Sequence, residues 1–468
     1  MNVPATHLHY LELTELAARI QARAISPMAA VRAQLDRIAA LDGTLASYAL
    51  VMADTALAEA KAAEAEIAAG RYRGPLHGVP IAVKDLFWTK GVPTAGGMAI
   101  HRDYRPAEDA TVVRRLREAG AVLLGKLQMT EGAYSDHHPS ITPPRNPWHA
   151  GYWPGISSSG PGVTIAAGLA YGALGSDTGG SIRWPSAANG ITGLKPSWGR
   201  VSRHGTFELA ASLDHVGPMA RSAADVAVLL SAIAGADARD PTALSDPVPD
   251  YLVEAARGLR GLRIGIDPAW NGDGVDAETQ AVLTNAIEAF CGLGADIVTV
   301  QCPDVTQAVI DWFSNCAVEA AVAHDATYPK QKAEYGTTLA SVIEAGRALS
   351  GTDYQKILLR RMDLRGTFVA LFRTVDLLLT PVHPLPPPTL ATMDKLGTEP
   401  ELGLRMLRFT SPFDMTGNPT ITLPGGFSAS GLPIGFQLVA GHLNEAMLVR
   451  AGVAFQSVTT WHRRHSIP

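Results

Sequence analysis

The chain has 468 residues, of which 47% are hydrophobic and 18% are charged, so it can bury a large core. Its net charge of −5 and the lack of a long basic run give no reason to expect nucleic acid as a partner. No stretch approaches the roughly 18 uninterrupted apolar residues of a membrane-spanning helix, so no membrane partner is expected. Residues 1–11 also lack the pattern of a signal peptide.

The first predicted elements are mainly helical, over residues 1–70, where Ser26-Pro27 has the form of a helix start. Residues 79–83 then predict a strand, 109–119 a helix and 121–124 a second strand. An apolar run of small residues predicts a buried helix over 163–173. The exposed faces of the N-terminal helices would offer a surface for a homodimer.

The later elements are predominantly strands separated by helical patterns. The strands are predicted over 262–266, 297–300, 375–379, 420–423 and 434–439. This alternation predicts an α/β protein whose helices cover both faces of a central sheet. The turn-rich residues 424–433 predict an antiparallel hairpin, so the sheet should be mixed. Length alone would allow two or three domains, but no segment resembles a linker, and we expect one catalytic domain over 1–468 with its chemical motifs in 74–200.

The three cysteines, Cys291, Cys302 and Cys316, are odd in number and lack the spacing of metal ligands. We therefore expect reduced thiols in a cytoplasmic protein. No metal site and no cofactor are expected.

Lys84 closes an apolar run that begins at Val79. On a strand it would share a face with Pro80 and Ala82. A lone lysine at a strand end is usually one that reaches out to solvent. The alternative is a lysine in a poorly solvated pocket, where desolvation lowers the pKa and frees a lone pair to accept a proton.

Ser181 follows Thr178-Gly179-Gly180, and glycines allow successive N–H groups to converge on an oxyanion. An ordinary turn is the simpler interpretation of this segment by itself. The chain has no second Asp-Thr/Ser-Gly, which excludes an aspartic protease. The segment also lacks the spacing of a phosphate-binding loop or a dinucleotide fingerprint.

Ser157 lies before Pro161, with Ser159 placed to cap the following helix. No Gly-x-Ser-x-Gly elbow occurs, which disfavours a Ser-His-Asp hydrolase. Four histidines lie near these motifs, and a structural role is the simpler interpretation for each: His77, His137, His138 and His149.

Together these segments resemble the amidase signature family. The resemblance runs through Gly74-Pro-Leu-His-Gly-Val-Pro-Ile-Ala-Val-Lys84-Asp, Ser157-Ser-Ser-Gly, Gly175-Ser-Asp-Thr-Gly-Gly-Ser181-Ile-Arg183 and Gly193-Leu-Lys-Pro196. It continues through Phe413-Asp-Met-Thr-Gly-Asn-Pro419 and Gly431-Leu-Pro-Ile-Gly435 to Trp461-His462, in the expected order over nearly the whole chain. Two departures concern the segment Gly155-Ile156-Ser157 and the segment Ala188-Asn189-Gly190, and neither removes a catalytic group.

The resemblance implies an amidase that cleaves a carbon–nitrogen bond of a small amide through a serine acyl-enzyme. Ser181 would be the nucleophile, Ser157 a bridging serine after a cis peptide bond, and Lys84 the terminal base. The backbone amides of four residues would form the oxyanion hole: Thr178, Gly179, Gly180 and Ser181. Asp177 and Arg183 would pair and support this loop.

The substrate pocket is less defined by the sequence. Candidate wall residues are Met129, Tyr134, Trp148, Trp184 and Trp312. Three alternatives stay open: a carbamate, urea-type or anilide hydrolase, a glutaminase component of a tRNA-dependent amidotransferase, and an inactive binding protein. The last is disfavoured because all three reacting groups are present.

Overall fold

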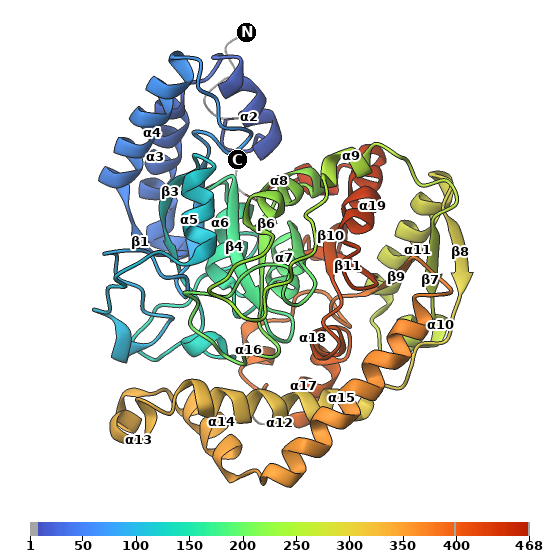
Figure 1. Ribbon diagram of the computed structural model, residues 1–468. Coiled ribbons are helices and arrows are strands. Elements are labelled where there is room, and N and C mark those ends of the chain that lie inside the picture. Colours follow the sequence, from blue (N-terminus) through green and yellow to red (C-terminus); the bar gives the residue numbers. More distant parts are fainter. Residues whose placement is uncertain (1–7, 397–398, 467–468) are drawn as a thin grey trace.

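The computed structural model describes residues 8–396 and 399–466, whose strands form one eleven-stranded sheet (Figure 1). The strands are β1 (Tyr48–Val51), β2 (Pro80–Lys84), β3 (Val122–Leu127), β4 (Gly172–Asp177), β5 (Thr192–Lys195), β6 (His215–Ala220), β7 (Arg263–Ile266), β8 (Asp296–Thr299), β9 (Leu377–Pro381), β10 (Thr420–Phe427) and β11 (Pro433–Ala440). Their order in the sheet is β1-β3-β2-β4-β6-β5-β10-β11-β9-β7-β8. The pairs β3-β2, β2-β4, β9-β7 and β7-β8 are parallel and the other pairs are antiparallel, which confirms the predicted mixed sheet.

Helices surround this sheet. They are α2 (Leu13–Gln21), α3 (Pro27–Leu45), α4 (Ala53–Ala68), α5 (Thr111–Glu118), α6 (Ser159–Ala166), α7 (Arg183–Asn189), α8 (Ala223–Ile233), α9 (Tyr251–Ala255), α10 (Pro268–Gly272), α11 (Ala277–Gly292), α12 (Thr306–Ala323), α13 (Tyr328–Gln331), α14 (Thr337–Ala348), α15 (Gly351–Leu371), α16 (Leu390–Met393), α17 (Pro400–Leu407), α18 (Ser411–Met415) and α19 (Glu445–Val458). No helix among the described residues has the length and apolar character needed to cross a membrane.

Strand β2 shows how the core is divided between the two faces of the sheet. Ile81 belongs to the larger hydrophobic cluster, with Leu116 of α5. Ala82 belongs to a second cluster, with Val163 of α6. Successive side chains of a strand point to opposite faces, so helices cover both sides as predicted. Lys84 lies two residues beyond Ala82 and faces the side of α6.

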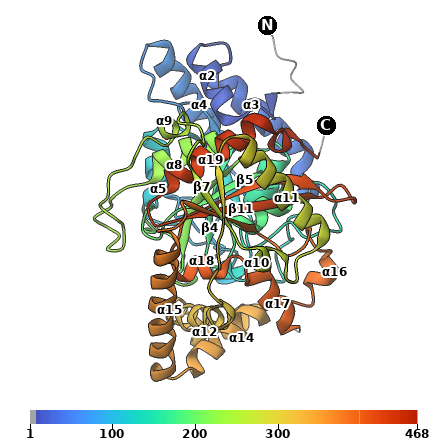
Figure 2. The same ribbon diagram turned by 90° about the vertical axis from the view of Figure 1, so that its right-hand side faces the viewer.

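The helices α12, α14, α15 and α17 form a layer at one end of the molecule, on the side opposite to α3 and α4 (Figures 1 and 2). Buried Glu131, in the loop after β3, accepts a hydrogen bond from Gly336 N at 3.0 Å, directly before α14. This bond attaches the helical layer to a loop of the sheet region.

Three predictions need correction. The segment 1–70 is not wholly helical, because β1 pairs with β3 as a short edge strand of four residues; residues 1–7 lie outside the described part. The helix predicted over 163–173 ends at Ala166, because Gly168 adopts a left-handed φ of +73° and β4 follows. Strands β4, β5 and β6 were not predicted. The helix start at Ser26 is confirmed, since its side chain accepts from Ala29 N at 3.1 Å.

Candidate active site

Lys84 lies at the end of β2 between two parallel neighbours and is completely buried. Its Nζ is 2.7 Å from Ser157 Oγ and 2.9 Å from Ser176 Oγ. Burial lowers the pKa of Lys84 from 10.5 to about 7, although the carboxylates of Asp177 and Asp214 act in the opposite direction. No carboxylate of the described residues forms an ion pair with this amine. The alternative of a solvated lysine is therefore excluded, and a neutral amine is available near neutral pH.

Ser157 lies in a loop that is bonded to the loop of Ser181. The peptide bond between Ile156 and Ser157 is cis. Ser158 N donates to Ser181 O at 3.3 Å, and Ser158 Oγ donates to Ser176 O at 3.1 Å. Among the residues that the structure describes, none is hydrogen-bonded to the Ser181 hydroxyl. The predicted cap of α6 is wrong by one position, because Ser159 is the first helical residue and Ser158 precedes it.

The side chain of Asp177 shapes the loop that carries Ser181. It accepts hydrogen bonds from Gly180 N at 2.7 Å and from Ile182 N at 2.9 Å. The amide of Gly180 is thus already engaged, which corrects the prediction that it would be free for an oxyanion. Within the described part of the chain no acceptor is bonded to the amides of Gly179 or Ser181. These two amides remain available to a ligand.

The ion pair of Asp177 and Arg183 is present and extends to Asp414 of α18. Arg183 Nη2 lies 2.8 Å from Asp177 Oδ1 and 2.5 Å from Asp414 Oδ2. Burial alone would raise the pKa of Asp177, but the Arg183 guanidinium holds it well below its ordinary value. Burial raises the pKa of Asp414 well above its ordinary value. One guanidinium therefore fixes the loop to a segment more than 200 positions away in sequence.

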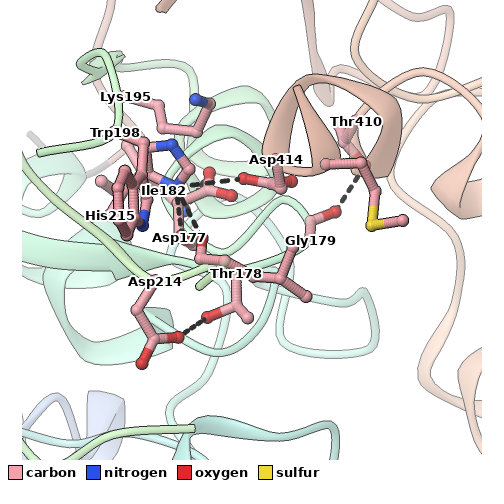
Figure 3. A network of polar contacts seen from close by, with 12 residues as sticks. Asp177, Thr178, Gly179, Ile182, Lys195, Trp198, Asp214, His215, Thr410 and Asp414 are labelled. Carbon is pink, nitrogen blue, oxygen red and sulfur yellow. Dashed lines mark hydrogen bonds and ion pairs between the residues drawn. The ribbon is translucent and has the colours of Figure 1, made fainter. Parts of the chain in front are cut away.

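Two side chains hold the carbonyl groups of the same loop from outside. Trp312 Nε1 of α12 donates to Thr178 O at 2.7 Å. Thr410 Oγ1 donates to Gly179 O at 2.6 Å (Figure 3). A side chain at position 179 would meet the Trp312 ring at 2.4 Å, so the close approach requires glycine. Because a peptide unit is planar, fixing the Thr178 carbonyl also fixes the direction of the Gly179 amide.

A cavity of about 500 Å³ opens above Ser181. Its floor comprises Ile156, Thr178, Gly179 and Ser181, and its walls include the predicted residues Tyr134, Trp184 and Trp312. The other lining residues come mainly from the helical layer and are mostly apolar: Ile310, Phe313, Ser314, Thr338, Ser341, Val342, Leu396, Pro400, Gly403, Leu404 and Leu407. These residues lie outside the segments that carry the family resemblance.

Two predicted wall residues do not line this cavity. Met129 is fully buried in the larger hydrophobic cluster. Trp148 donates its Nε1 to Asn189 O at 2.9 Å and packs against Phe427. Met129 packs in the core and Trp148 has its contacts away from the cavity. The prediction that they line the substrate pocket is therefore wrong for both.

One histidine, His137, lies beside the start of α6. His137 Nε2 lies 3.1 Å from Ser159 Oγ, and burial lowers its pKa to about 4. No described histidine is hydrogen-bonded to Ser157 or Ser181. No group of three or more potential metal ligands occurs among the residues that the structure describes.

Sequence reasoning missed Ser176, Trp312 as a hydrogen-bond donor, and the α18 contacts of Thr410 and Asp414. Ser176 and Asp414 lie inside the quoted segments Gly175-Ser-Asp-Thr and Phe413-Asp-Met-Thr, so a signal for them was present. Nothing in the sequence pattern brings position 312 to the Ser181 loop.

The chain is similar to known proteins along most of its length. A family model described as Amidase matches residues 29–449. A Mycobacterium tuberculosis protein named "Putative amidase AmiD" is 50% identical over 455 residues, covering 97% of this chain and 95% of that protein. One component of the glutamyl-tRNA(Gln) amidotransferase of Anaeromyxobacter dehalogenans is 40% identical over 483 residues, covering 97% and 98%. The structure of a bacterial aryl acylamidase of the amidase signature family superimposes with a TM-score of 0.87 at 26% identity, covering 97% of each chain.

Proposed function

Because this chain belongs to the amidase signature family and is an amidohydrolase acting on carbon–nitrogen bonds, we propose that it works through an acyl-enzyme on Ser181. Ser157 passes the proton of Ser181 to Lys84. The amides of Gly179 and Ser181 stabilise the oxyanion. Asp177 and Arg183 keep the loop in position.

The observation that carries this proposal is the environment of Lys84. Its Nζ is 2.7 Å from Ser157 Oγ, it is completely buried, and its pKa is lowered to about 7 by that burial. A base with a pKa near the working pH is the most effective proton acceptor. Its direct partners are hydroxyl groups, which can pass a proton on as well as accept one.

Atoms and protons balance in the proposed reaction. Ser181 Oγ forms a bond to the carbonyl carbon while its proton moves through Ser157 to Lys84. The tetrahedral oxyanion collapses, the C–N bond breaks, and Lys84 returns the proton through Ser157 to the departing ammonia or amine. Water then attacks the acyl-enzyme by the same relay, and the carboxylic acid and free Ser181 are released.

The test is the site of covalent labelling. A serine-directed fluorophosphonate should modify Ser181, as mapped by mass spectrometry, and Ser181→Ala should hydrolyse no amide while keeping its fold. Ser314→Ala, which removes another hydroxyl of the cavity, should be labelled like the wild type. Labelling at Ser157 would reverse the two serine roles.

A location in the cytoplasm is part of the same proposal. The cysteines Cys291, Cys302 and Cys316 form no disulfide. Free thiols are typical of a reducing compartment. Fractionation of cells that express the chain with an enzymatic tag at its C-terminus would test this.

A further inference from the structure

The cavity above Ser181 has no charged side chain in its lining. The lining residues are aliphatic, aromatic or hydroxylic, and none of those that the structure describes is Asp, Glu, Lys, Arg or His. The helical layer contributes mainly apolar side chains to the lining, such as Ile310, Phe313, Val342 and Leu407. An acyl group that extends from Ser181 therefore enters a mainly apolar space.

Three of the seven hydroxyl side chains in the described part of the lining are bonded to protein partners. Thr178 Oγ1 donates to Asp214 at 2.7 Å, and Ser341 Oγ donates to Thr338 O at 2.8 Å. Thr338 Oγ1 donates to the exposed carboxylate of Asp136, beside the lining. A carboxylate on the substrate would meet no cation here and would approach a like charge.

The size of the cavity points to a large acyl group. About 500 Å³ lies within the roughly 300–1,000 Å³ of sites that enclose drug-sized ligands. An acetyl group would leave most of this space empty, whereas a longer alkyl chain or a phenyl ring on a short chain would fill more of it.

We propose that this cavity selects a bulky, uncharged and mainly apolar acyl group, and that the chain discriminates against free glutamine and other carboxylate-bearing amides. The proposal rests on the acyl-enzyme role of Ser181. Burying a charge without a partner is strongly unfavourable. The ammonium and carboxylate groups of free glutamine would be buried in this way, without charged partners. The chain would thus differ in substrate from a glutaminase despite its similarity to a component of an amidotransferase.

The first experiment compares ammonia release from four primary amides by the purified chain, without tRNA: heptanamide, adipic acid monoamide, L-glutamine and acetamide. Heptanamide and the monoamide have similar length but differ in charge. The kcat/KM for heptanamide should exceed that for each of the other three by at least about 100-fold.

Glutamine or the monoamide turning over as well as heptanamide would overturn this inference while leaving the proposed function intact, provided that Ser181→Ala abolishes both reactions. Heptanamide hydrolysis that survives Ser181→Ala would overturn the proposed function instead.

The second experiment shortens the cavity at Gly403 of α17. A Cβ at this position would lie 3.4 Å from a ring carbon of Phe313, and the glycine is not in the left-handed region, so a side chain can be built there. Gly403→Leu should lower the ratio of kcat/KM for heptanamide to that for acetamide at least about tenfold, since the leucine occupies space that the chain of heptanamide needs. Arg405→Ala, on the exposed side of the same helix, should leave the ratio unchanged. An unchanged ratio in Gly403→Leu would overturn the inference.

Discussion

Lys84 and Lys126 are two completely buried lysines on adjacent strands, and they have different surroundings. Lys126 pairs in register with Val83, so it points to the opposite face from Lys84. Its Nζ lies 3.1 Å from Asp85 Oδ1, 2.9 Å from Phe87 O and 2.8 Å from Thr94 Oγ1. Lys84 has two hydroxyl partners and no carboxylate partner.

The difference shows that burial alone does not make a lysine a base. Burial lowers the pKa of both side chains, but at Lys126 the carboxylate of Asp85 directly opposes the shift. Asp85, the Phe87 carbonyl and Thr94 also provide one acceptor for each of the three N–H donors of the Lys126 ammonium group. Lys126 therefore has the surroundings of a structural cation, whereas Lys84 has those of the base in the proposed relay.

The largest expected effect is on kcat, which should respond differently to substitution of Lys84 and of Lys126. Lys84→Met should lower kcat at least about 10,000-fold, since the relay loses its proton acceptor. Lys126→Met should keep the kcat of its folded fraction within about threefold, since it touches no reacting group. Steady-state rates, normalised to titrated active sites, would check both. A Lys84→Met enzyme with near wild-type kcat would refute the relay.

The second prediction concerns stability, for which Lys126 should be the more important of the two lysines. Lys126→Met leaves the Asp85 carboxyl buried without its cation and should cost about 3–5 kcal/mol in the free energy of unfolding. Chemical denaturation would measure this loss. Adding Asp85→Asn should restore part of it, because the two residues are coupled. If the double variant lost the sum of the single effects, the pair would not be coupled.

The third prediction concerns the serine that Lys84 contacts. Ser157→Ala should lower kcat roughly 100- to 1,000-fold, within the range of a lost proton-transfer group. Ser176→Ala removes the other hydroxyl partner of Lys84 and should cost less than Ser157→Ala. Rapid-quench measurement of acylation would compare them. Equal losses would mean that Ser157 only positions the lysine.

The smallest effect is on pH dependence. Lys84 acts when neutral, so kcat/KM should rise with pH below its pKa of about 7, tenfold per unit, and level off above it. Burial also lowers the pKa of Lys195 to about 7. Lys195→Met is therefore the control and should keep the inflection. An inflection that disappears in this variant would assign it to Lys195.

The sequence indicated which segments meet around Lys84 better than it indicated the strands that carry them. Lys84, Ser157 and Ser181 lie in segments with their own local signature of glycine, proline and serine. Strand β4, by contrast, is buried on both faces and has no polar alternation, so its small apolar residues were interpreted as the end of a helix.

The walls and supports of the site were only partly predictable. Tyr134, Trp184 and Trp312 were expected on aromatic character, and the same argument failed for Trp148. Whether an aromatic side chain lines a cavity depends on contacts between distant segments, as with Trp148 and Phe427. Amphipathic periodicity shows that α14 and α17 bury one face, but it does not show which partner they bury it against.

The hydrogen bond from Trp312 to Thr178 has a consequence for how such an enzyme can be re-engineered. The groups of the proposed relay lie between residues 84 and 181, whereas the helical layer lines the cavity with residues between 310 and 407. Substitutions in the helical layer would therefore change the acyl preference without altering the relay. Position 312 is the exception. An α12 without an indole N–H at this point would release the loop that carries Ser181.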